Sequence, residues 1–236
     1  MRAFIDLHCH TSASFDSLAA PEAVVKAAAE RGLTHLVISD HDRIDGALRA
    51  RDAAPEGLTV IVGEEIKTAD GDLVAAFLQE AVPPGLPARD AIAAVRAQGG
   101  LVGIPHPFDR FRGSMLNDPK LEAIAPLVDW VEAHNARVVG GNGNERAAAF
   151  AREMGLPGVA VSDAHSVLEV GVAWTALDGD PSTPEGLLAA LTNVELVPGR
   201  ASYIVRLLTP VAKLVNRARG NRRVPSGSAA EADRPQ

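Results

Sequence analysis

The sequence predicts a single-domain α/β fold in which alternating strands and helices form a closed barrel. Short apolar stretches alternate with helix-like stretches along most of the chain, and apolar strands of this kind are buried on both faces of a mainly parallel sheet. A length of 236 residues with 47% apolar and 22% charged residues is enough for one large core. In addition, polar side chains typical of metal sites follow one apolar stretch after another.

Strand and helix alternate with short connections in the first half of the chain. Pro21 is favoured at the first position of a helix and Gly32 at its end. Asp70-Gly71 is a turn sequence that indicates a hairpin-like excursion between two strands. We expect strands at residues 3–7, 33–39, 58–62 and 73–77, and helices at residues 21–32, 45–53 and 88–97.

The second half continues this alternation and then changes in character. We expect a helix at residues 144–154. We expect further strands at residues 101–104, 128–132, 159–161, 172–177 and 194–197. Residues 1–199 are therefore assigned to the barrel. Residues 200–219 form a helical extension in which Pro210 predicts a kink. Residues 220–236 have too few apolar side chains to fold and are predicted to be disordered.

The positions of the polar residues favour a closed barrel over an open, doubly wound sheet. In a barrel the C-terminal ends of the strands meet at one rim, where such folds place their chemistry. An open sheet would scatter the same residues along an edge. Six polar residues lie at or just beyond the ends of six expected strands: His8, His41, Glu65, His106, His134 and Asp163.

Composition and charge narrow the class of protein and of partner. No stretch approaches the roughly 18 apolar residues of a membrane span, the N-terminus begins with a strand rather than a signal peptide, and Cys9 is the single cysteine. We therefore expect a soluble, cytoplasmic protein. Residues 200–236 carry a net charge of +6, which leaves −13 on residues 1–199. An acidic body favours a small phosphorylated substrate, or a short oligonucleotide, over a large nucleic-acid interface.

Two pairs of residues with i, i+2 spacing form the centre of an expected metal site. His8 and His10 project to the same face of a strand, as do Asp163 and His165. Asp16 follows in a Ser-rich loop that can fold back over the rim. A His-x-His pair alone also occurs by chance, but together with the residues at the other strand ends it indicates a metal site.

Three further residues are expected metal ligands. His41 lies between Asp40 and Asp42, either of which could orient its ring. Glu65 ends an apolar strand and could bridge two metals. The prolines on both sides of His106 fix its backbone. Nitrogen and oxygen donors of this kind suit Zn, Mn or Fe(II).

The ordered motifs of the chain resemble those of the PHP (polymerase and histidinol phosphatase) family of metal-dependent phosphoesterases. These motifs are DLHCHTSASFD, SDHD, GEEI, PHPFD, EAHNAR and SDAH, and they cover residues 4–165. The resemblance implies a distorted seven-stranded (β/α)7 barrel whose rim holds up to three divalent metals. The implied ligands are His8, His10, Glu65 and Asp163 for the first metal, Glu65 and His106 for the second, and Asp16, His41 and His165 for the third.

The second metal has one ligand fewer than the family pattern. Members often have a histidine shortly after the Glu motif, on the strand that here spans residues 71–77, where Val74 or a neighbour takes its place. Either another group such as His134 substitutes, or the protein works with two tightly held metals. We therefore expect two to three divalent ions.

The resemblance implies hydrolysis of a small phosphate ester, a metabolite or nucleotide, by attack of a metal-bound hydroxide. Coordination lowers the pKa of water to about 7, so no dedicated side-chain base is required. The candidate leaving-group acids are His134 and Asp109, and the candidate phosphate-binding residues are Arg137, Arg112 and Lys67.

Three alternatives stay open. The first is a 5'-3' exonuclease or phosphodiesterase that acts on oligonucleotide ends. The second is a C–N hydrolase of the amidohydrolase type, which Asp163-x-His165 and the His41 motif fit poorly. The third is a non-catalytic metal-binding module, which the missing ligand suggests and the otherwise near-complete ligand set opposes.

Overall fold

The computed structural model describes residues 1–109, 118–202, 205 and 208–223. Most expected elements are present with shifts of one or two residues at their ends. The strands are β1 (Arg2–Cys9), β2 (His35–Ile38), β3 (Thr59–Lys67), β4 (Asp72–Ala76), β5 (Leu101–Ile104), β6 (Trp130–Asn135), β7 (Gly158–Val161), β8 (Trp174–Asp178) and β9 (Val194–Val197). The helices are α1 (Pro21–Glu30), α2 (Asp45–Asp52), α3 (Ala88–Ala97), α4 (Asp118–Ile124), η1 (Ala125–Leu127), α5 (Gly143–Glu153), α6 (Pro184–Ala190) and α8 (Leu208–Ala218).

The described strands form one sheet that is nearly closed into a barrel, which confirms the predicted fold class. The strand order is β7-β6-β5-β4-β3-β2-β1-β8-β9. This sheet has nine strands rather than the seven that the resemblance implies, because β8, beside β1, and β9, beside β8, extend it as antiparallel strands. Closure occurs beyond the end of β7, where Cys9 and Ala164 form a parallel bridge. The N-terminal and C-terminal motifs therefore meet at one rim.

The expected hairpin-like excursion is present between β3 and β4. Strand β4 runs antiparallel to both β3 and β5, whereas β1, β2 and β3 pair in parallel, as do β5, β6 and β7. The register aligns Glu65 with Val74 and Lys67 with Asp72. Strand β3 is longer than the sequence predicts, so Glu65 lies within it rather than beyond its end.

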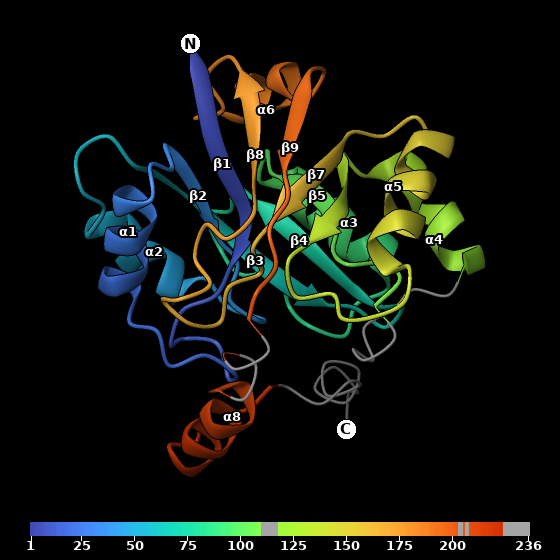
Figure 1. Cartoon of the computed structure of the whole chain (residues 1–236). Helices are drawn as coiled ribbons and strands as arrows, with labels where there is room; N and C mark the ends of the chain where they lie inside the picture. Colours follow the sequence, from blue (N-terminus) through green and yellow to red (C-terminus); the bar gives the residue numbers. More distant parts are fainter. Residues whose placement is uncertain (110–117, 203–204, 206–207, 224–236) are drawn as a thin grey trace, which may run out of the picture.

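Apolar side chains fill two layers of the core. One layer occupies the barrel interior and includes Leu7, Val37, Ile61, Val74 and Trp130. The other layer lies between the sheet and the helices, with α1 and α2 on one side and α3, α4 and α5 on the other (Figure 1). Leu187 of α6 belongs to the interior layer and is fully buried. The floor beneath the rim is therefore packed with apolar side chains.

The C-terminal helix α8 lies at the end of the molecule opposite α6 (Figure 1). Of the tail predicted to be disordered, the structure describes Gly220 to Arg223, and these residues contact the rest of the chain. The assignment of residues 224–236 stays a prediction. Among the described residues, none of the helices has the length and apolar character that crossing a membrane requires.

Gly103 of β5 provides a test of this packing because it pairs with Trp130 of β6. A Cβ atom at residue 103 would lie 2.0 Å from Nε1 of the buried Trp130 indole. We expect Gly103→Ala to lower the free energy of unfolding by about 1–3 kcal/mol, as overpacking of a core does. Chemical denaturation measures this change.

Trp130→Leu supplies the matched background for this measurement, because leucine has no atoms in place of Nε1 and Cε2, the indole atoms that Gly103 faces. In that background Gly103→Ala is expected to cost less than in the wild type, and equal costs in both backgrounds would contradict the packing argument.

Candidate metal centre

The carboxylate of Glu65 lies at the centre of a cluster of histidines at the barrel rim. Its Oε2 atom is 3.3 Å from Nε2 of His8, 3.3 Å from Nε2 of His10 and 3.2 Å from Nδ1 of His41. Its Oε1 atom is 3.5 Å from Nε2 of His106. Glu65 is only 2% exposed. One buried carboxylate thus faces four imidazoles from three different segments, which is the position that the sequence predicts for a bridging ligand.

The first group of potential ligands comprises His8, His10 and Glu65, whose donor atoms lie within 4.8 Å of one another. Nε2 of His8 and Nε2 of His10 are 2.9 Å apart. Oδ1 of Asp163 is 3.6 Å from Nε2 of His10 and 3.8 Å from Nε2 of His8. The four residues expected to share one metal are therefore brought together by β1, β3 and the segment after β7.

The second group comprises His10, Asp16, His41 and His165, again within 4.8 Å of one another. Oδ2 of Asp16 lies 3.4 Å from Nε2 of His41 and 3.2 Å from Nε2 of His165. The three residues expected to share a metal meet here, and His10 joins them.

The Ser-rich loop folds back over the rim as the sequence predicts. The Ser12 N–H donates to the Ala19 carbonyl at 2.7 Å. Ser14 Oγ donates to Asp16 Oδ1 at 3.0 Å, and Ser17 Oγ donates to the His165 carbonyl at 3.0 Å. These hydrogen bonds fix the Asp16 carboxylate against the two histidines.

Glu132 of β6 is a site residue that the sequence reasoning missed. Its Oε1 atom is 2.6 Å from Nδ1 of His8, and its Oε2 atom accepts hydrogen bonds from the His106 N–H at 2.9 Å and from Asn135 Nδ2 at 2.8 Å. A carboxylate on Nδ1 requires that nitrogen to carry the proton, which leaves Nε2 of His8 free for a metal. Asn135 Nδ2 also donates to Asp163 Oδ2 at 2.9 Å.

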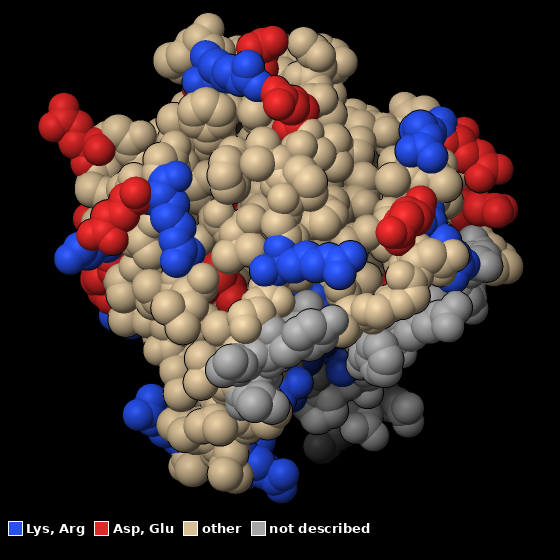
Figure 2. All heavy atoms as spheres, viewed as in Figure 1, with Lys and Arg blue, Asp and Glu red and all other residues tan. Residues whose placement is uncertain are grey.

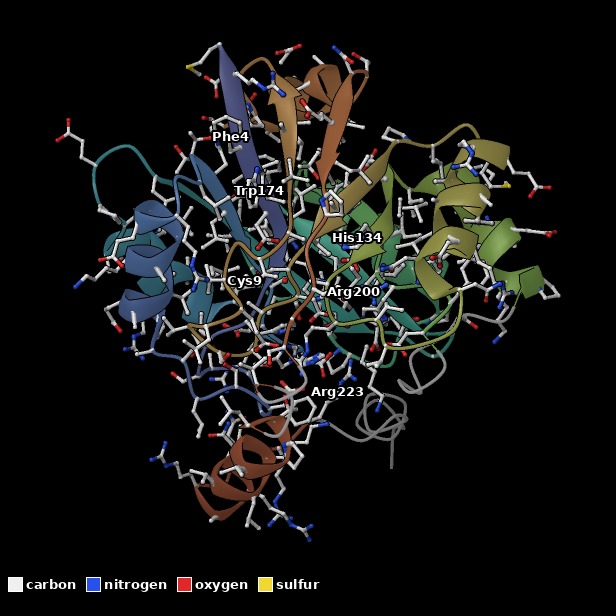
Figure 3. All side chains as sticks on the ribbon, viewed as in Figure 1. Phe4, Cys9, His134, Trp174, Arg200 and Arg223 are labelled. Atoms are coloured by element: carbon white, nitrogen blue, oxygen red, sulfur yellow. The ribbon has the colours of Figure 1, made fainter. Side chains whose placement is uncertain are left out.

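An irregularity in β6 explains why His134 is not at the centre. Glu132 pairs with Val159 and His134 with Ala160, so the two residues face opposite sides of the sheet despite their i, i+2 spacing. Nε2 of His134 lies 2.8 Å from the Gly199 carbonyl and Nδ1 is 3.3 Å from Asn144 Nδ2. Figure 3 shows His134 beside Arg200. These contacts give no support to His134 as a metal ligand or as an acid.

The other candidate residues differ in their surroundings. Arg137 is 8% exposed, donates from Nη2 to Thr209 Oγ1 at 2.7 Å, and places Nε 3.5 Å from Glu169 Oε1. Lys67 ends β3, where its N–H donates to Asp42 Oδ1 at 2.8 Å. Asp109 is buried three residues after His106. Arg112 lies outside the described residues.

Four residues just beyond strand ends have the left-handed backbone conformation that residues other than glycine seldom adopt. The φ angles are 56° for Asp42, 65° for Phe77, 26° for His106 and 52° for Asp163. Such conformations cost on the order of 1–3 kcal/mol each and are concentrated at functional sites. Two of the four, His106 and Asp163, are expected metal ligands, and Asp42 follows His41.

The electrostatics of the cluster are those of a site built for cations. Burial lowers the pKa of His10, but hydrogen bonds with Asp163 and Glu65 outweigh this effect and raise it to about 9. Burial and the positive charge of Arg137 lower the pKa of His165 to about 3, which keeps this imidazole neutral and able to bind a metal. Burial opposes ionisation of Asp16, yet His165 and His41 hold its pKa well below the usual range.

The donor set fits divalent metals. Every potential ligand is an imidazole nitrogen or a carboxylate oxygen, the combination that suits Zn, Mn and Fe(II). Nδ1 of His41 is buried and lies 3.2 Å from Oε2 of Glu65, but it forms no hydrogen bond among the described residues. A ring nitrogen in this state is explained by a cation that the ring binds.

Two family models match successive parts of the chain. The PHP domain model matches residues 6–111 and the PHP-associated model matches residues 141–195. The uncharacterized protein MJ0417 of Methanocaldococcus jannaschii is 31% identical over 173 residues, which cover 72% of this chain and 68% of that protein. The chain belongs to the PHP family.

Other PHP relatives match less of the chain or share only its fold. A 5'-3' exoribonuclease of Haemophilus influenzae is 44% identical over 64 residues, which cover 27% of this chain and 23% of that enzyme. A crystal structure from Bacteroides vulgatus, described as a two-domain protein containing a predicted PHP-like metal-dependent phosphoesterase, superposes with a TM-score of 0.71 at 20% identity. The match covers 84% of this chain and 65% of that one, so the shared feature is the barrel.

Replacement of Glu132 by Gln tests its role beside His8. Glu132 uses one carboxylate oxygen for His8 Nδ1 and the other for the His106 N–H. Gln has only one oxygen, and its amide nitrogen cannot accept a hydrogen bond, so one of these two contacts is lost. We expect Glu132→Gln to weaken metal binding about 10- to 100-fold, as measured by competition with a chromophoric chelator. His134→Gln on the same strand is the control and is expected to bind metal like the wild type. Unchanged affinity in Glu132→Gln would remove Glu132 from the centre.

Metal affinity is expected to rise with pH between about 6 and 9. The pKa of His10 in the metal-free protein is about 9, so below this pH a proton occupies the imidazole and competes with the metal. Each pH unit below 9 lowers the affinity up to about tenfold for one displaced proton. Calorimetric titration with Mn²⁺ in buffers of different ionisation enthalpy measures both the affinity and the proton release. An affinity independent of pH would contradict a protonated His10.

Proposed function

We propose that this PHP-family chain is a metal-dependent hydrolase of phosphate esters, with a small metabolite or nucleotide as substrate. The observation that carries the proposal is that two groups of buried nitrogen and oxygen donors share His10 and both adjoin Glu65. Two cations held side by side in this way can clamp the attacking and leaving oxygens of an in-line displacement at phosphorus. Bound divalent ions also lower the pKa of water and neutralise charge on the phosphoryl group.

The residues of the chain then have distinct tasks. The expected metal ligands are His8, His10, Asp16, His41, Glu65, His106, Asp163 and His165. Glu132 holds the proton on Nδ1 of His8 and thereby orients the ring. The Glu132 carboxylate also accepts a hydrogen bond from the His106 N–H, which ties strand β6 to the loop after β5.

Arg137 is the best-supported phosphate-binding residue. It is buried near His165, whose pKa it lowers, and its Nη1 atom has no hydrogen-bond partner among the described residues. A guanidinium group with a free donor beside a metal group matches the oxygens of a phosphate. Lys67 and Arg112 stay proposals for the same role, and Asp109 stays the proposed leaving-group acid.

A second candidate function is hydrolysis at the 5' end of a short oligonucleotide. The identity with the Haemophilus exoribonuclease favours it, although the match covers only 27% of this chain. Lys and Arg side chains also gather around α8, at the bottom of the view in Figure 2. This helix contains Lys213 and Arg217. Rates on nucleoside monophosphates, cyclic nucleotides and short oligonucleotides, measured at equal metal loading, separate the two candidates.

His10→Ala and Asp163→Ala test the proposal directly. Both changes remove donors that face the first metal group, and we expect the Mn²⁺-dependent hydrolysis of an aryl phosphate to fall at least about 100-fold. His35→Gln is the control, because His35 is buried but bonds to Thr34 and Ser182 instead. Retained activity in both variants would remove these residues from the site. Fewer than one metal per chain, with no activity after Mn²⁺ or Zn²⁺ is added, would overturn the proposed function itself.

A further inference from the structure

The C-terminal segment returns to the metal centre after α8. Gly220 has a φ of 83°, which turns the chain back at the end of the helix. Asn216 is 2% exposed, and its Nδ2 donates to the carbonyls of Ser14 at 3.1 Å and Ser17 at 2.9 Å. Asn221 Nδ2 donates to the Ala13 carbonyl at 2.8 Å. Two asparagines thus fasten this segment to the loop that carries Asp16.

The anchored segment places Arg223 between two buried carboxylates. Nη2 of Arg223 is 2.8 Å from Oδ1 of Asp72, and Nε is 3.5 Å from Oδ2 of Asp42. Its Cζ lies 5.9 Å from the Phe15 ring, which itself contacts His41. Figure 3 shows Arg223 between α8 and the barrel rim. A guanidinium in this position is a fixed positive charge at the mouth of the site.

These carboxylates adjoin the Glu65 part of the cluster. Asp72 pairs with Lys67 and Val74 pairs with Glu65, so Asp72 is one step nearer the rim on the face that Glu65 shares. Strand β4, which carries Asp72, lies between β3 and β5, and β5 leads to His106. On the other side, the Asp42 N–H donates to the Glu65 carbonyl at 3.1 Å.

This is also the part of the centre where the metal ligands are fewest. Of the two groups of potential ligands found among the described residues, one contains Glu65, but neither contains His106. Burial lowers the pKa of Arg223, but Asp72, Glu65 and Asp42 outweigh burial and raise it. The negative charges of Asp72, Glu65 and Asp42 are therefore already balanced in part by the guanidinium of Arg223.

We propose that Arg223, which pairs with Asp72 and Asp42 next to the Glu65 strand, provides the positive charge that a divalent ion at Glu65 and His106 would otherwise provide, so that the protein holds two ions and excludes this third one. The inference rests on the proposed function. A guanidinium and a divalent ion compete for the same carboxylates, because both require Asp72 and Glu65 as the neutralising charges. Loss of the arginine leaves these acids free to bind metal.

Metal stoichiometry of the full-length protein tests this inference without reference to activity. Metal-free protein is titrated with Mn²⁺ by calorimetry, and bound Mn²⁺ is counted by elemental analysis after gel filtration. The wild type is expected to bind two ions per chain. Arg223→Gln is expected to bind a third, and Arg223→Lys, which keeps a positive charge, is expected to bind two. The matched control is Arg222→Gln, since the neighbouring Arg222 is exposed and is expected to leave the count at two.

A second variant ties the extra ion to its carboxylate. In Arg223→Gln combined with Asp72→Asn, the third ion is expected to be lost. Three ions in the wild type, or two in Arg223→Gln, would overturn the inference. Either result would leave the proposed function intact if the wild type hydrolyses phosphate esters, whereas failure to bind any Mn²⁺ would overturn both. Thermal unfolding of each variant shows whether the fold is retained.

Discussion

The metal centre depends on the backbone hydrogen bonds that close the barrel between β1 and the segment after β7. The Asp163 N–H donates to the His8 carbonyl at 2.9 Å, and the His10 N–H donates to the Ala164 carbonyl at 2.8 Å. Beneath them, Asp6 Oδ1 accepts from the Ser162 N–H at 3.0 Å, and burial raises the pKa of this carboxyl to about 6. These bonds bring the first and last ligand motifs of the chain to one point.

Closure of the barrel also brings many ionisable side chains together, and their charges must be balanced. Carboxylates and imidazoles at the rim are removed from water, and buried ionised groups are stable only when paired. In the metal-free protein, protons on histidines such as His10 balance part of the negative charge, and Arg223 balances another part. Divalent ions that bind to these ligands would replace the protons. Metal binding, protonation and the position of the C-terminal segment are therefore linked through the same few carboxylates.

The side chains around the ligands explain how the ligands keep their orientation. Glu132 and Asn135 connect His8, His106 and Asp163 in one network from β6. The prolines beside His106 and the unusual backbone angles of His106 and Asp163 hold the ligands in conformations that an unconstrained chain avoids. Packing of the barrel interior below, with Trp130 against Gly103, provides the rigid floor that such strain requires.

The sequence by itself determined the α/β barrel and its strands and indicated eight candidate ligands, because hydrophobic periodicity and i, i+2 spacing are local properties. It did not determine the faces of Glu132 and His134, since a bulge in β6 reverses the alternation of side chains along that strand. Nor did it predict that Arg223, in a segment without apolar periodicity, reaches Asp72 about 150 residues away in the chain. Contacts of that kind depend on how α8 docks, and only the tertiary structure decides this.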